Sequence, residues 1–94
     1  MIDIDFDKAV AQAAGMAQCA DGIMQQYNKL NSLIADIRRS WKGETADAYI
    51  RKLEEFATIL ESDAKKCRDA ATNFRTKVNF IKQTEETAKS ILAN

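Results

Sequence analysis

The sequence predicts an all-α fold, an antiparallel two-helix hairpin that dimerises into a four-helix bundle. The 94 residues contain no Pro, and helix-forming residue types dominate the composition. Apolar residues recur at steps of three and four on both sides of one break, at residues 40–44. A chain of this length is one domain. We therefore expect a single helical hairpin over residues 1–94.

The break at 40–44 has the residues of a tight turn between helices. Arg38 and Arg39 precede it, where cations suit the C-terminus of a helix. Gly43 supplies the backbone freedom that a sharp reversal needs. Thr45 follows as an available N-cap. We therefore place the first helix at about 6–39 and the second at about 45–90.

The first helix has a continuous heptad seam, which Asp5 or Asp7 could cap at its start. The seam consists of Ile2, Phe6, Ala9, Ala13, Met16, Ala20, Ile23, Tyr27, Leu30, Ile34, Ile37 and Trp41. As its last member, Trp41 is predicted to be buried at the bend. A strip beside the seam widens the apolar face, and with two seam residues it forms the predicted dimer or partner interface: Val10, Ala17, Met24, Ile23 and Tyr27.

The second helix has its own seam, in which two steps of four adjoin at Leu60 and predict a stutter. Its members are Ala46, Tyr49, Leu53, Phe56, Leu60, Ala64, Cys67, Ala71, Phe74, Val78, Ile81, Ala88 and Leu92. Both helices rise about 1.5 Å per residue, so folding them about the turn places position 30 opposite about position 56. Residues from about 81 to 94 then overhang as a tail, apolar at Phe80 and Ile81, which we expect to fray.

Composition and charge argue against several classes of function. Lys plus Arg is 14 and Asp plus Glu is 14, whereas a nucleic-acid binder concentrates basic residues on one face. There is no His, so neither a zinc site nor a His-based triad can be assembled from this chain. Carboxylate pairs such as Glu54–Glu55 are typical of a solvated helix surface. We expect no enzyme, no cofactor, no metal and no small-molecule substrate.

The two cysteines, Cys19 and Cys67, fall at about the same height in the predicted hairpin. Two buried free thiols are one interpretation. An intramolecular disulfide is the other, if the protein reaches an oxidising space.

The N-terminus is acidic and has no long apolar run, so it does not match a cleavable secretory signal. No apolar run approaches the roughly 20 residues of a membrane span. The protein is therefore predicted to be cytoplasmic, or to be made in the cytoplasm and exported without a cleaved signal.

Trp41-Lys42-Gly43 lies mid-chain between two amphipathic helices in a chain of 94 residues. In this it resembles the WXG superfamily of ESAT-like proteins of type VII (ESX) secretion systems. The resemblance covers essentially the whole chain. It implies a homo- or heterodimeric four-helix bundle that is exported folded. It also implies that the turn, through Trp41 and Gly43, helps the secretion ATPase or a partner to recognise the protein.

The chain departs from the family pattern in its tail. Many members carry a C-terminal Tyr-x-x-x-Asp/Glu export signal, but Tyr27 and Tyr49 lie far from the C-terminus and lack the acid four residues later. Either a variant signal around Phe80 acts, or a partner supplies the signal. The resemblance implies three kinds of partner: a second copy, a WXG paralogue, or the helical N-terminal domain of a larger secreted toxin.

The leading hypothesis is a secreted protein that acts by helix–helix binding, as substrate, export partner or toxin-targeting subunit, with a role in virulence. A location on the cell surface is an alternative. One rival function is a cytosolic coiled-coil adaptor. Another is a membrane-active effector, although the chain has no basic amphipathic face.

Overall fold

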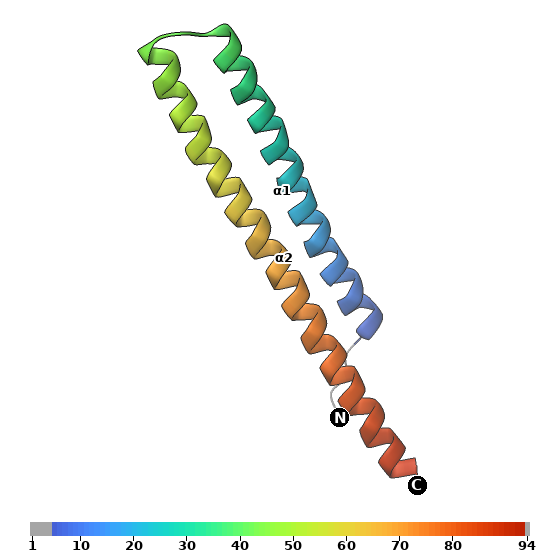
Figure 1. The fold of residues 1–94 in the computed structure, drawn as a ribbon. Coiled ribbons are helices and arrows are strands. Elements are labelled where there is room, and N and C mark those ends of the chain that lie inside the picture. Colours follow the sequence, from blue (N-terminus) through green and yellow to red (C-terminus); the bar gives the residue numbers. More distant parts are fainter. Residues whose placement is uncertain (1–4, 94) are drawn as a thin grey trace.

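The computed structural model describes residues 5–93, which form two antiparallel helices side by side (Figure 1). Helix α1 runs from Phe6 to Ser40 and helix α2 from Glu44 to Ala93. The hairpin is a rod of 77 × 15 × 15 Å. The prediction of an all-α hairpin is confirmed, whereas its dimerisation stays a prediction. Two residues of the predicted elements, Ile2 and Asn94, lie outside the described range.

The helix ends follow from local hydrogen bonding. The Asp5 side chain caps α1 by accepting a bond from the Lys8 amide at 3.1 Å. Gly43 reverses the chain at φ 109°, a conformation that L side chains rarely adopt. The Asp47 amide then donates to the Gly43 carbonyl at 3.0 Å. Because α2 already begins at Glu44, the prediction of Thr45 as its N-cap is wrong.

The buried residues form one seam along each helix, and on α2 the seam differs from the predicted one. On α1 they are Ala9, Ala13, Ala20, Ile34 and Ile37, all members of the predicted seam. On α2 they are Ala46, Ile50, Ala57, Ala64, Ala71 and Val78. Ile50 and Ala57 thus replace Tyr49 and Phe56, which are exposed. With this replacement the buried and half-buried positions alternate by four and three from Ala46 to Glu85, so the predicted stutter is wrong.

Helix α2 continues well past the start of α1, as the lower end of Figure 1 shows. Ile81 is half-buried, and beyond it the apolar residues Ile91 and Leu92 are exposed. Phe80 is exposed as well. Within the described residues, neither helix has an apolar stretch long enough to cross a membrane.

Candidate functional site

Trp41 lies on the surface of the turn, with 54% of its residue area exposed. The prediction that it is buried at the bend is wrong. Its backbone has already left the helix, at φ −112° and ψ 140°, so the side chain no longer follows the seam of α1. The indole packs instead against Tyr49, with ring centroids 6.1 Å apart and the ring planes tilted by 36°. The turn therefore presents two aromatic rings to solvent.

A shallow hollow borders the indole at the turn. Besides Trp41 it is lined by Arg38, Lys42, Gly43, Asp47, Ile50, Arg51 and Glu54. The Lys42 ammonium donates to the Arg38 carbonyl at 3.2 Å, close to the last turn of α1. An exposed aromatic pair beside several charged groups is suited to binding another protein surface, because aromatic and Arg side chains dominate many interfaces.

Below the turn, large apolar side chains gather on one side of the helix–helix contact. A hollow on this side is lined by Leu30, Leu33, Phe56 and Leu60, with Gln26 and Lys29 at its edge. Leu33 is 48% exposed and Phe56 is 52% exposed. Tyr49 lies seven residues before Phe56, in the same heptad position, and Ile59 lies one turn after it.

The same side has a second hollow at the far end of the hairpin. It is lined by Asp5, Lys8, Ala9, Gln12, Phe74, Lys77, Val78 and Ile81. Phe74 lies fourteen residues after Leu60, and Gln12 lies fourteen before Gln26, so these residues occupy equivalent heptad positions. We call the whole surface, from Tyr49 and Leu33 to Phe74 and Ile81, the apolar face.

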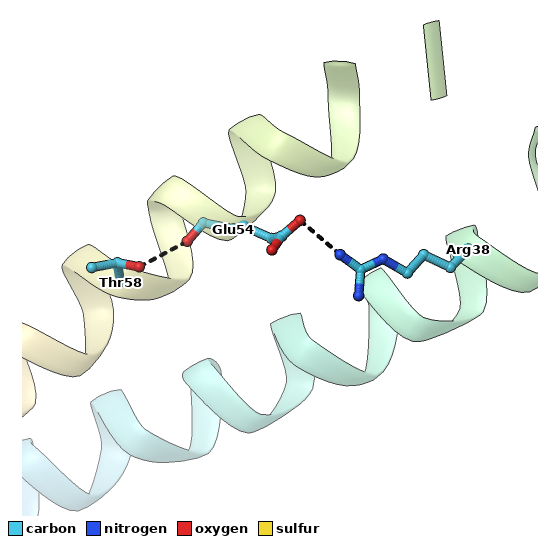
Figure 2. A network of polar contacts seen from close by, with 3 residues as sticks. All are labelled: Arg38, Glu54 and Thr58. Atoms are coloured by element: carbon cyan, nitrogen blue, oxygen red, sulfur yellow. Dashed lines mark hydrogen bonds and ion pairs between the residues drawn. The ribbon is translucent and has the colours of Figure 1, made fainter. Parts of the chain in front are cut away.

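The opposite side of the helix–helix contact is charged. Arg38 of α1 donates to Glu54 of α2 at 2.8 Å, and the Thr58 hydroxyl donates to the Glu54 carbonyl at 3.1 Å (Figure 2). Farther from the turn, Arg68 of α2 lies 3.7 Å from Asp21 of α1. A column at steps of seven residues along α2 continues this side: Asp47, Glu54, Glu61, Arg68, Arg75, Lys82 and Lys89. We call this surface the charged face.

The predicted interface residues are divided between the two faces. Ile23 lies seven residues before Leu30 and therefore belongs to the apolar face. Tyr27 lines a hollow with Glu54 and Glu61 on the charged face. The remaining three, Val10, Ala17 and Met24, lead by steps of seven to Asn31 and Arg38, and so they follow the charged face.

Both cysteine thiols are free in the structure. Cys19 is exposed and Cys67 is half-buried, so neither is buried and the interpretation as two buried thiols is wrong. By heptad position both lie toward the apolar face, Cys67 seven residues after Leu60 and Cys19 seven before Gln26. Their pairing under oxidation stays a prediction.

The fold and the turn together define a class of protein: a small helical hairpin with an exposed Trp-X-Gly turn and one uncovered apolar face. The family model described as "WXG100: Proteins of 100 residues with WXG" matches residues 1–86, and the chain belongs to this family. Its members are small proteins associated with type VII secretion. No curated protein and no solved structure matches the chain significantly.

Sequence reasoning missed most of the apolar face near the turn. It assigned Tyr49 and Phe56 to the contact inside the hairpin and did not single out Leu33 or Ile59. One signal was available. A seam through Ile50 and Ala57 alternates by steps of four and three without a fault, whereas a seam through Tyr49 and Phe56 requires a stutter. The regular seam places Tyr49 and Phe56 outside the helix contact.

Proposed function

We propose that this chain is exported by, or together with a substrate of, a type VII secretion system, and that it acts by binding another helical protein through its apolar face. The observation that carries the proposal is the line of exposed Leu33, Tyr49, Phe56 and Ile59 on a chain of the WXG100 family. Large contiguous apolar patches on a small protein are typical of protein interfaces.

The hairpin itself gives the reason for a partner. Two helices have a poor ratio of core to surface, and each leaves part of its apolar stripe uncovered. A second pair of helices would cover Leu33, Phe56 and the half-buried residues between them, forming a four-helix bundle. The partner is a second copy, a WXG paralogue or the helical N-terminal domain of a larger toxin.

The exposed turn would then serve recognition by the secretion ATPase or by a partner. Trp41 and Tyr49 are outside the buried seam, and each exposes about half of its surface. Exposed aromatic side chains of this kind are common anchors of protein interfaces.

The overhanging end of α2 is the other segment that could reach the secretion machinery. Because Tyr-x-x-x-Asp/Glu is absent, we favour an export signal that the partner supplies. Deletion of residues 83–94 should then leave export intact, although the complex could weaken. Lost export with partner binding intact would place the signal in this chain.

The direct test is secretion in the native host. The protein should reach the culture medium only when the secretion ATPase is intact. Phe56→Asp should abolish export, because a carboxylate in the middle of the apolar face prevents the partner from burying it. Ser62→Asp adds the same charge at an exposed position off this face and should be exported normally.

Other outcomes would favour the rival functions. Protein that stays in the cytoplasm whether or not the ATPase is present would favour a cytosolic adaptor. Leakage of liposomes at neutral or acidic pH would favour a membrane-active effector. Normal export of Phe56→Asp would contradict the role of the apolar face.

A further inference from the structure

The residues that border the apolar face carry mostly one sign of charge. Its lysines are Lys8, Lys29, Lys52, Lys66 and Lys77. Lys29 lines the hollow near the turn, and Lys8 and Lys77 line the hollow at the far end. The other two lie seven residues before and seven after Ile59. We call these five residues the lysine rim.

The carboxylates among the same positions are fewer, and two of the three are already engaged. They are Asp5, Asp36 and Asp63. Asp5 caps α1, and Asp36 forms an ion pair with Arg39 on its own helix. Within residues 5–93 the only ion pair of the lysine rim joins Lys52 to Glu55 at 3.7 Å, between exposed side chains. The five lysines and three carboxylates that border the apolar face therefore have a net charge of +2, in a chain whose formal net charge is zero.

We infer that the apolar face is built for a partner other than a second copy: a helical hairpin whose own apolar stripe is bordered by Asp and Glu. The inference rests on the proposed function and removes one of the partners left open there, the second copy. In a dimer of two identical chains through this face, one lysine rim meets the other, and like charges across an interface act against association. An acidic border would instead place a carboxylate opposite each rim lysine.

The charged face supplies a contrast within the same molecule. There, acidic residues of α2 near the turn change to basic residues farther along, and α1 provides counter-charges at Arg38 and Asp21. Two members of that column, Glu54 and Arg68, are therefore paired inside the hairpin. Within residues 5–93 no ion pair joins the lysine rim to α1, so its lysines remain available to carboxylates of another molecule.

A charge-reversed copy of this chain is the probe. The acid-rim variant carries Lys8→Glu, Lys29→Glu, Lys52→Glu, Lys66→Glu and Lys77→Glu. Sedimentation equilibrium should show that wild type and the acid-rim variant form a 1:1 dimer at least about tenfold tighter than either forms alone, since each exposed opposite-charge pair contributes about 0.2–1 kcal/mol. Raising the NaCl concentration should weaken the mixed dimer and strengthen self-association of wild type, because salt screens attraction and repulsion alike.

A matched control separates the rim from net charge. The charged-face variant carries Arg51→Glu, Lys65→Glu, Arg75→Glu, Lys82→Glu and Lys89→Glu. It therefore has the same number of charge reversals, all on residues outside the rim. It should bind wild type no more tightly than wild type binds itself. Circular dichroism verifies that both variants are helical, and Phe56→Asp in either chain of the mixed pair should abolish the complex.

Two results would overturn the inference and can be told apart. A wild-type homodimer as tight as the mixed dimer removes the selection by charge, while the proposed binding by the apolar face stands. No association in the mixture, together with normal export of Phe56→Asp, removes the apolar face as a binding site and the proposed function with it.

Discussion

The two halves of the hairpin are held together by different side chains. Near the turn, Ile34, Ile37 and Ile50 form the buried core, with Leu30 and Leu53 packed against them. In the far half the buried residues are Ala9, Ala13, Ala20, Ala64, Ala71 and Val78. Isoleucine buries much more apolar area than alanine, at about 0.8 kcal/mol per CH₂ group. The half near the turn is therefore the better stabilised one.

The far half places its large apolar residues elsewhere. Met16, Ile23 and Phe74 are only half-buried, and all three belong to the apolar face. The alanines let the two helices approach closely, and the larger side chains lie outside this contact, on the apolar face. The difference indicates that the half near the turn can order within one chain, whereas the far half has little large buried apolar surface of its own.

The largest expected effect is in the half near the turn. Ile34 is 4% exposed, and Ile34→Ala should lower the free energy of unfolding by about 2–5 kcal/mol, because it removes buried area and leaves a cavity. Urea denaturation followed by circular dichroism measures the change. A loss below that range would mean that the isoleucine cluster does not dominate the stability of the hairpin.

In the far half, a larger side chain in the helix contact should lower the free energy of unfolding. Ala20 is 0% exposed in the helix contact, so Ala20→Leu should force the helices apart and cost about 1–3 kcal/mol. Ala35→Leu, at an exposed position of α1, is the control and should change stability by less than about 0.5 kcal/mol. If Ala20→Leu stabilises the protein, the helices are not in close contact there.

At the turn, Trp41→Ala tests stability and recognition separately. A fully buried Trp would cost about 3–5 kcal/mol on truncation. Because Trp41 is half exposed and packs mainly on Tyr49, we expect a loss of about 1 kcal/mol. Denaturation measures that loss, and the secretion assay measures the function. A variant that remains helical and binds its partner but is not exported would support recognition by the turn; export at the wild-type level would contradict it.

Some parts of the fold could be predicted from the sequence and others could not, and the reason differs from one part to the next. The hairpin was predictable because the break at 40–44 lies between two long periodic segments, and Gly43 has the positive φ that a sharp reversal requires. The exposure of Trp41 was not predictable, because periodicity applies only while the backbone is helical. The seam of α2 was misassigned at Tyr49 and Phe56 because large aromatic residues were favoured over Ala57 as core. At positions 56 and 57, as in the far half, the small residue fills the contact and the large one lies on the apolar face.

The smallest expected effect concerns the ion pair between the helices near the turn. Arg38 and Glu54 are 2.8 Å apart, but their side chains are 57% and 50% exposed. A double-mutant cycle with Arg38→Gln and Glu54→Gln should give a coupling energy of about 0.2–1 kcal/mol that shrinks as salt is added. The pair between Asp21 and Arg68, at 3.7 Å in the far half, should give less. A larger coupling in the far half would reverse the comparison, since charge rather than a partner would then compensate for its alanine contact.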